Sequence, residues 1–156
     1  MTQVGFITGG ASGFGLELSK KLIGRGWIIY AADKDSKAVA LTKEFGAVPV
    51  TLDVTDAKKT KAAIDKVIKK EGRIDLLVAN AGFGNFSTVE EMTSEQVQQI
   101  FAVNVFGVEA CIRAALPPDA EAALGTDSHH HIGCRARVSG RTWLVCGHKA
   151  LDEGSG

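Results

Sequence analysis

The sequence predicts an α/β fold built on a doubly wound parallel sheet, and two observations carry this prediction. Short apolar runs alternate with longer segments of helical periodicity, and a glycine-rich stretch separates the first run from the first such segment. Strands that alternate with helices indicate a parallel sheet covered on both faces, because each crossover lays a helix on the sheet. Right-handed crossovers then give the doubly wound topology.

The expected elements follow in chain order. The first helix shows the pattern clearly, since Leu18 and Leu22 lie one turn apart and Gly24 ends the apolar spacing. Gly72 separates the longest amphipathic segment from the fourth apolar run. We expect strands at 3–8, 27–32, 48–52 and 74–79, and helices at 14–24, 36–45, 56–71, 94–103 and 105–116.

Composition excludes several classes of function. The 156 residues suit a single domain, and a formal net charge of zero offers no basic surface to a nucleic acid or an anionic membrane. No apolar run reaches the ~18 residues of a transmembrane helix. The N-terminal residues 1–3 lack the basic segment of a signal peptide. We therefore expect a soluble, cytoplasmic protein.

The cysteines and histidines predict neither disulfides nor a metal site. Cys111, Cys134 and Cys146 form no C-x-x-C pair, so we expect free thiols in a reducing compartment. Three adjacent histidines, 129–131, point in different directions and rarely share one ion. The spacing of Cys134, Cys146 and His148 fits no familiar zinc finger.

The strongest motif is Thr8-Gly9-Gly10-Ala11-Ser12-Gly13-Phe14-Gly15, between the first strand and the first helix. Gly9 can take a tight turn, Gly13 lets the backbone approach a pyrophosphate, and Gly15 lets the helix pack close to the sheet. The helix N-terminus then offers N–H groups and a partial positive charge to the phosphates. The alternative is an ordinary glycine-rich loop. No Gly-Lys-Ser/Thr follows, which excludes a Walker-type ATP loop.

Asp33 ends the second strand, 18 residues after Gly15. A carboxylate there can accept hydrogen bonds from a ribose 2′-hydroxyl and repel a 2′-phosphate, so NAD is the expected cofactor. Lys34 next to it weakens this preference, and NADP remains the alternative.

The α/β pattern stops at residues 117–118, a Pro-Pro pair. Between Pro118 and Arg137 the only large apolar side chains are Leu124 and Ile132. The segment 126–131, Thr-Asp-Ser-His-His-His, cannot be buried in a sheet without stranding polar groups. We therefore expect a sheet truncated after about four strands. Residues 1–117 would form an NAD(P)-binding, Rossmann-like domain, and 118–156 an aberrant, poorly ordered tail.

Four motifs in order resemble the short-chain dehydrogenases/reductases. They are T-G-x-x-x-G-x-G at 8–15, Asp53-Val54 after the third strand, Asn80-Ala81-Gly82 after the fourth, and Asn104 within Phe-Ala-Val-Asn-Val. The resemblance covers roughly residues 3–117. It implies an oxidoreductase that interconverts an alcohol and a carbonyl with NAD(P). It also implies association of subunits through the helix near 105–117.

The resemblance implies a role for each motif. Asp53 and Val54 would face the adenine, Asn80 to Gly82 would lie along the cofactor, and Asn104 would hold a water of the proton relay. The structural alternatives are a helix N-cap for Asp53, a turn for 80–82 and a satisfied buried amide for Asn104. The expected cofactor-binding residues are Thr8, Gly9, Ser12, Gly13, Phe14, Gly15, Asp33, Asp53, Val54, Asn80, Ala81 and Gly82.

The family's chemistry also needs residues that this chain lacks. It uses a serine after the fifth strand and a Tyr-x-x-x-Lys on the next helix, with the tyrosine as general acid/base. The only tyrosine is Tyr30, in the second strand, and Val145 stands four residues before Lys149. The catalytic candidates are therefore Asn104 and Lys149 alone. Loss of the proton donor removes the ~10²–10⁴-fold that acid/base catalysis contributes.

We hypothesise that the tail, from about residue 118, is translated in the wrong reading frame. Each amino acid allows only certain codons. The amino acids that a reading frame shifted by one base could encode can therefore be partly deduced from the protein sequence. In that frame 127–131 permits Ile-Val-Ile-Ile-Thr, the missing strand, and a serine can replace Ile132. Val145 permits tyrosine and Lys149 permits lysine, which restores the family's spacing. The alternative is a divergent family member with a novel tail.

Two functional hypotheses follow. The first is an NAD(P)-dependent oxidoreductase, supported by the glycine-rich loop, Asp33, Asn80 and Asn104. The second is a non-catalytic dinucleotide-binding fragment, or a product without a function of its own, supported by the missing serine and tyrosine. Both hypotheses can hold if the family is one of enzymes and this particular chain catalyses the reaction slowly or not at all.

Overall fold

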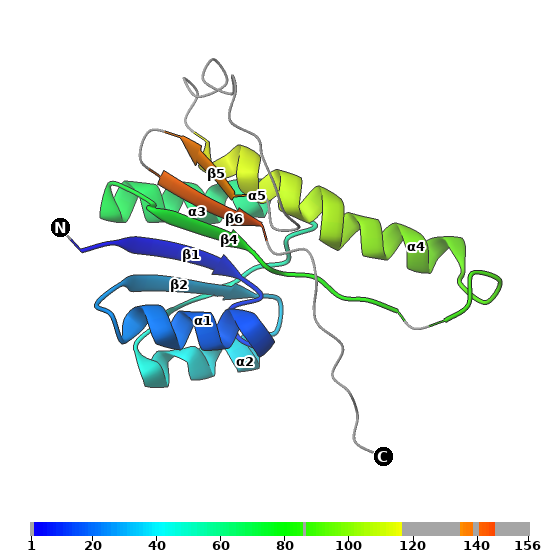
Figure 1. Cartoon of the computed structure of the whole chain (residues 1–156), viewed down its shortest axis with the longest axis horizontal. Coiled ribbons are helices and arrows are strands. Elements are labelled where there is room, and N and C mark those ends of the chain that lie inside the picture. The colour runs from blue at the N-terminus through cyan, green and yellow to red at the C-terminus, as the bar shows by residue number, and fades with distance from the viewer. Residues whose placement is uncertain (1, 86, 117–134, 139–140, 146–156) are drawn as a thin grey trace.

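The structure is a computed structural model that describes residues 2–85, 87–116, 135–138 and 141–145. It contains one sheet of order β3-β2-β1-β4-β6-β5 with helices on both faces (Figure 1). The predicted doubly wound α/β architecture is confirmed. Four parallel strands of the sheet come from β1 (Val4–Thr8), β2 (Ile28–Asp33), β3 (Val48–Thr51) and β4 (Leu76–Ala79).

The strands are apolar on both sides because helices cover both sides. On one face Phe6 and Leu77 pack in a cluster with Ile64 and Cys111. On the other face Ile7, the next residue of β1, packs with a second cluster that includes Leu22. The alternation of side chains along a strand therefore divides the interior into two cores.

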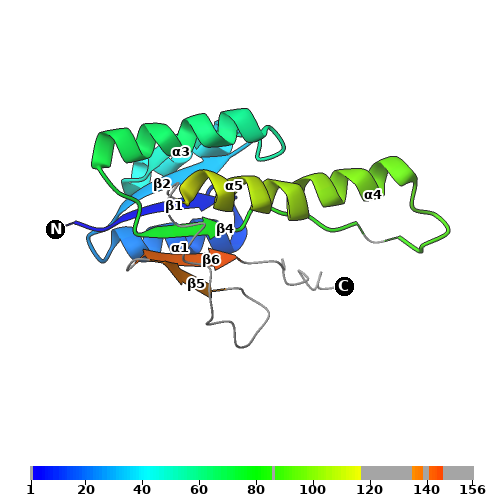
Figure 2. The same cartoon turned by 90° about the horizontal axis from the view of Figure 1, so that it is seen from above.

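Helices α1 (Gly13–Ile23) and α2 (Ser36–Leu41) lie together on one side of the sheet, and α3 (Ala57–Glu71) and α5 (Val108–Ala115) lie on the other (Figures 1 and 2). Local caps fix where these helices begin. The Asp35 carboxylate accepts hydrogen bonds from the N–H groups of Lys37 and Ala38, and the Asp56 carboxylate accepts one from Lys59. The segment expected as one helix to residue 45 ends as a 3₁₀ turn, η1 (Thr42–Phe45).

The two helices expected at 94–103 and 105–116 form one continuous helical rod. α4 (Ser94–Phe101) passes through a π-helical segment, η2 (Ala102–Gly107), into α5. Such single π-turns change the direction of the side chains that follow them and occur at functional sites. α4 has no buried residue, and both views show it extending away from the sheet (Figures 1 and 2).

The sheet continues beyond the four expected strands. β6 (Arg141–Val145) pairs parallel with β4, and β5 (Arg135–Val138) pairs antiparallel with β6. The expectation that no further strand follows residue 117 therefore needs correction. The Trp-Leu-Val run at 143–145 has the apolar character that a strand beside β4 requires, and it lies 12 residues beyond the polar segment 126–131. The segment 126–131 itself lies outside the described residues.

Among the described residues, no helix is long and apolar enough to cross a membrane. No group of three or more metal-ligating side chains occurs in this part of the chain. Cys111 is a buried free thiol, and its burial raises the pKa of that thiol to about 12. Cys134 and Cys146 fall outside the described residues.

Candidate functional site

The loop after β1 is fixed by hydrogen bonds from the end of β4. The Thr8 hydroxyl accepts the N–H groups of Asn80 and Ala81, each at 3.0 Å, and donates to the Val78 carbonyl at 3.4 Å. The Asn80 amide donates to the carbonyls of Thr8 and Gly9 at 3.1 and 3.3 Å. Because β1 and β4 are neighbours, these side chains hold the two strand ends at one edge of the sheet.

Three glycines give this loop its shape. Gly9 and Gly13 have φ angles of +62° and +50°, which other residues rarely adopt. A Cβ on Gly15 would lie 2.2 Å from the Gly9 carbonyl oxygen, so the first turn of α1 packs directly on the loop backbone. A Cβ on Gly13 would meet nothing within 4 Å, and the space in front of this residue is open.

Helix α1 presents its N-terminus to that open space. The first N–H groups of a helix have no acceptor within it, and they carry a partial positive charge. Ser12 is the N-cap, yet its hydroxyl makes no capping bond, so it is available to a ligand. Phe14 in the first turn is 64% exposed. These features suit an anionic group such as a phosphate.

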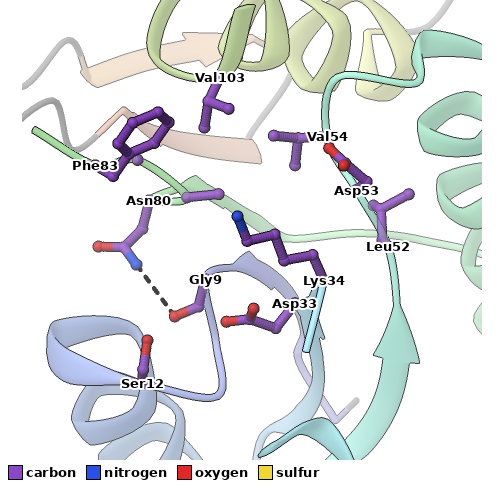
Figure 3. A pocket seen from close by; sticks show the side chains of 12 residues that line it. Gly9, Ser12, Asp33, Lys34, Leu52, Asp53, Val54, Asn80, Phe83 and Val103 are labelled. Carbon is purple, nitrogen blue, oxygen red and sulfur yellow. Dashed lines mark hydrogen bonds between the residues drawn. The ribbon is translucent and has the colours of Figure 1, made fainter. Parts of the chain in front are cut away.

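A cavity of about 230 Å³ lies at this carboxyl edge of the sheet (Figure 3). Three of its walls come from the loop after β1, the segment after β3 and the segment after β4. Ligands of open α/β sheets bind outside the carboxyl ends of the strands, where this cavity lies. Its lining comprises Gly9, Ser12, Asp33, Lys34, Leu52, Asp53, Val54, Asn80, Ala81, Gly82, Phe83 and Val103.

Asp33 and Lys34 line the cavity from the end of β2 (Figure 3). Asp33 is half-buried, and its carboxylate also accepts a 3.3 Å hydrogen bond from the Asp35 N–H. The structure thus brings an acidic and a basic side chain to the same wall. The acidic side chain would repel the 2′-phosphate of NADP, and the basic one would attract it. The two side chains therefore leave the choice between NAD and NADP open, as the sequence does.

Asp53 and Val54 line the cavity from the segment after β3, beside the end of β2, and they differ in burial. Val54 is 7% exposed and belongs to the core cluster, whereas Asp53 is exposed. The Asp53 carboxylate accepts hydrogen bonds from the N–H and hydroxyl of Thr55 at 2.9 and 2.7 Å. These bonds, the backbone one first, lower the pKa of Asp53, and the charge of Lys34 adds to the effect. The N-cap of α3 is Asp56, so the N-cap alternative for Asp53 is wrong.

Asn104 lies in the π-helical segment, and its side-chain amide hydrogen-bonds the backbone of Phe83, a residue that lines the cavity. Its Oδ1 accepts the Phe83 N–H at 3.1 Å, and its Nδ2 donates to the Phe83 carbonyl at 2.8 Å. Gly82 has no side chain, and a Cβ there would lie 3.1 Å from Asn104 Oδ1. The amide is therefore satisfied as expected, but it is exposed rather than buried.

Tyr30 lies in the interior and not in the cavity. Its side chain is 5% exposed, and its hydroxyl donates to Glu71 Oε1 at 2.6 Å, at the C-terminal end of α3. Burial, followed by the Glu71 hydrogen bond, raises the pKa of Tyr30. The only tyrosine of the chain is thus occupied in a contact between β2 and α3.

The sequence did not predict two residues that line the cavity, Leu52 and Val103, or the role of Gly10, which supports the loop without lining the cavity. Leu52 and Val103 are apolar residues at the ends of elements, and nothing in their type distinguishes them from core residues. Gly10 is buried, and its N–H donates to the Ala32 carbonyl at 3.0 Å, so it ties the loop to β2. The Gly9-Gly10 pair in the sequence could have indicated that Gly10 is needed for close backbone packing. Lys149, the second catalytic candidate, lies outside the described residues.

The fold and the cavity define a class, the doubly wound α/β domains with a glycine-rich loop at the carboxyl edge of the sheet. The family model for "short chain dehydrogenase" matches residues 3–125. This chain belongs to the short chain dehydrogenase family.

Curated relatives agree with this assignment. The chain is 40% identical over 123 residues to the L-2,3-butanediol dehydrogenase of Corynebacterium glutamicum, covering 74% of this chain and 48% of that protein. It is 34% identical over 127 residues to a 3-alpha-(or 20-beta)-hydroxysteroid dehydrogenase of Mycobacterium bovis, covering 80% and 49%. The chain therefore spans about half the length of these relatives.

Solved structures show the same fold. A 3-ketoacyl-(acyl-carrier-protein) reductase from Brucella melitensis, complexed with NADH, superposes with a TM-score of 0.72 at 31% identity, covering 78% of this chain and 52% of that one. A short-chain dehydrogenase from Streptomyces avermitilis gives 0.71 at 30% identity, covering 78% and 46%.

Proposed function

We propose that this chain binds a nicotinamide dinucleotide in the cavity at the carboxyl edge of the sheet. The observation that carries the proposal is the shape of the glycine-rich loop: Gly15 packs on Gly9, and the space in front of Gly13, at the N-terminus of α1, is open. The pyrophosphate would lie there, on the N–H groups of 13–15 and the Ser12 hydroxyl. The adenine would lie against Val54, and Asn80 to Gly82 would follow the cofactor toward its nicotinamide end.

NAD is the preferred cofactor in this proposal. Asp33 lines the cavity, and its carboxylate would bond both hydroxyls of the adenosine ribose and repel a 2′-phosphate. Lys34 would offset part of that repulsion. Calorimetric titration with NADH and NADPH tests the preference. NADH should bind more tightly, Asp33→Ala should reduce the difference, and Lys34→Ala should increase it. Tighter binding of NADPH by the unchanged protein would contradict the preference.

The lineage is that of an oxidoreductase, for which the bound dinucleotide supplies the hydride acceptor or donor. We propose alcohol/carbonyl interconversion as the ancestral reaction, with a small molecule as substrate. Asn104 would act as a positioning residue, since its amide holds the Phe83 backbone beside the cavity. Lys149 would hold the ribose, and no residue assigned here replaces the proton-donating tyrosine.

We therefore propose that the chain itself has little or no turnover. Tyr30 cannot supply the proton, because it is buried and its hydroxyl bonds Glu71. Glu71 ends α3, whereas the cavity lies near the start of that helix. A turnover assay with NAD and a panel of secondary alcohols, run beside an intact family member, tests this. The expected rate is lower by at least ~10²–10⁴-fold. Comparable rates would contradict the proposal.

The reading-frame hypothesis concerns the origin of the tail. Its support is the abrupt change of composition at residues 117–118 and the Ser, Tyr and Lys that the shifted frame permits. Resequencing the coding DNA around 116–119 tests it directly. An undisturbed frame there would rule the hypothesis out and favour a divergent family member.

Association and location complete the proposal. Phe101, Val105 and Phe106 are exposed on the helical rod, which supports association through the helix near 105–117. Sedimentation over a range of concentrations should show reversible self-association. We propose a cytoplasmic location, supported by the buried free thiol of Cys111, and cell fractionation would test it.

A further inference from the structure

A second hollow lies at the free edge of the sheet, between β3 and α3. We call it the β3–α3 groove, and its volume is about 450 Å³. It shares Leu52 with the cofactor cavity but none of that cavity's charged residues. In the sheet formed by the described strands β3 is terminal, so none of those strands stands between the groove and solvent.

The floor of the groove is apolar. Val48 and Val50 of β3 are half-buried and pack against the core, and Val67 of α3 is 2% exposed. The buried ring of Tyr30 lines the groove as well. Val67 and Tyr30 are already buried, so a hydrocarbon group on this floor would remove from water mainly the apolar surface of the half-buried Val48 and Val50.

One wall of the groove is a row of lysines. Lys59, Lys66 and Lys70 line it, and their spacing of seven and four residues places them on one face of α3. The row is roughly 16 Å long at 1.5 Å per residue. Their flexible stems can lie along the floor while the ammonium groups stay in water.

The two outer lysines are already engaged, and the central one is not. Lys59 Nζ lies 3.2 Å from Asp56 Oδ2, and Lys70 Nζ lies 3.4 Å from Glu71 Oε1. Lys70 also donates to the Tyr30 hydroxyl at 3.2 Å, with its charge 5.6 Å from the ring centre. Within the described part of the chain Lys66 has no ion-pair partner. The groove thus carries an uncompensated positive charge at its middle.

The edge of β3 is closed to a peptide strand. Leu52 N–H donates to the Asp33 carbonyl at 2.8 Å, so alternate residues of β3 direct their N–H groups toward β2. Position 49 then faces outward, and it is Pro49, which has no N–H to donate. An added strand would lose a ladder hydrogen bond there, which favours a ligand that needs no backbone pairing.

We propose that the β3–α3 groove binds a small amphipathic carboxylate, with its head group at Lys66 and its hydrocarbon tail on Val48 and Val50. The charge of Lys66 complements the head group, and the apolar floor complements the tail. Binding is independent of the dinucleotide, because the two sites share only the buried Leu52 side chain.

Decanoate is the probe, titrated calorimetrically into the full chain below its micelle concentration, with and without NADH. Lys66→Glu is the test variant. Lys69→Glu is the matched control, because Lys69 is an exposed lysine of the same helix that does not line the groove. Both changes reverse one exposed charge, so neither should unfold the protein. Octanoate and decanol test the contributions of tail length and charge.

We expect saturable decanoate binding that Lys66→Glu weakens roughly fivefold or more, whereas Lys69→Glu changes it less than about twofold. Each methylene removed from the tail should weaken binding by roughly fourfold, and decanol should bind less well than decanoate. No saturable binding, equal effects of the two lysine variants, or equal binding of decanol would each overturn the proposal. Competition by NADH would overturn the independence of the two sites.

Discussion

At the scale of single residues, the shape of the site depends on a few close contacts. Thr8 is one of them, since one hydroxyl serves the N–H groups of both Asn80 and Ala81. Gly15 is another, since its missing side chain decides how closely α1 approaches the loop. Both residues shape the backbone of the loop on which we propose that the pyrophosphate lies.

We predict that Thr8→Val destabilises the fold and weakens dinucleotide binding. Valine preserves the shape but leaves two N–H groups without an acceptor, which costs about 2 kcal/mol. Thr8→Ser keeps the oxygen and should retain most of the stability. Urea denaturation of the two variants measures the difference. A Thr8→Val chain as stable as Thr8→Ser would show that the bridge between β1 and β4 contributes little.

We predict that Gly15→Ala disrupts the loop. The new Cβ would lie 2.2 Å from the Gly9 carbonyl oxygen, so the loop or the helix must move, at a cost of about 3 kcal/mol. Gly24→Ala is the control at the other end of α1, where the Cβ would meet the Lys20 carbonyl at an ordinary 3.5 Å. Thermal unfolding monitored by circular dichroism should separate the two variants, and equal melting temperatures would contradict the prediction.

At the scale of elements, the sequence predicted what depends on local chemistry. Apolar runs, glycine breaks and helix caps such as Asp56 act within a few residues, so the strands and helices up to residue 116 were found with small errors at their ends. The break expected near Asn104 is instead a π-turn, because a helix can absorb one extra residue without ending. Position 104 then carries the amide that bonds Phe83.

The strands after residue 117 show where such prediction fails. β6 takes the place beside β4, and its partner there is selected by the whole sheet rather than by the local sequence. A fifth strand was expected directly after the last helix, where the segment 118–137 has few large apolar side chains. A strand can pair from further along the chain, which no local pattern reports. Leu52 and Val103 were not predicted as cavity residues for the same reason, because their place in the cavity depends on tertiary structure and not on a local pattern.

The contact between β2 and α3 supports a prediction about pH. Tyr30 is the single tyrosine, so the absorbance of its phenolate reports one group. Burial and the Glu71 hydrogen bond raise its pKa, so the titration midpoint of the folded chain should lie above 10.0 and return to about 10.0 in urea. The sign follows: the stability from this group is complete below pH 10.0 and is lost as pH rises through the folded-state pKa. A folded midpoint at or below 10.0 would contradict the buried contact.

At the scale of the whole molecule, the sheet separates two tasks. Its carboxyl edge forms the cavity that we propose for a dinucleotide, and its β3 edge forms the groove that we propose for an amphipathic carboxylate. The helical rod begins with α4, which has no buried residue, and apolar side chains such as Phe101 are exposed there. The chain has its family's fold over about half of its relatives' length, and its sequence contains no Tyr-x-x-x-Lys motif.

The central claim is that this half still folds and binds a dinucleotide. Titration of the full chain with NADH, followed by the fluorescence of the nicotinamide, tests it most directly when the unchanged chain is compared with Gly15→Ala and Gly24→Ala. The account predicts saturable binding by the unchanged chain and by Gly24→Ala, and its loss in Gly15→Ala. An unchanged chain that gives no saturable signal, or a Gly15→Ala chain that binds equally well, would contradict it.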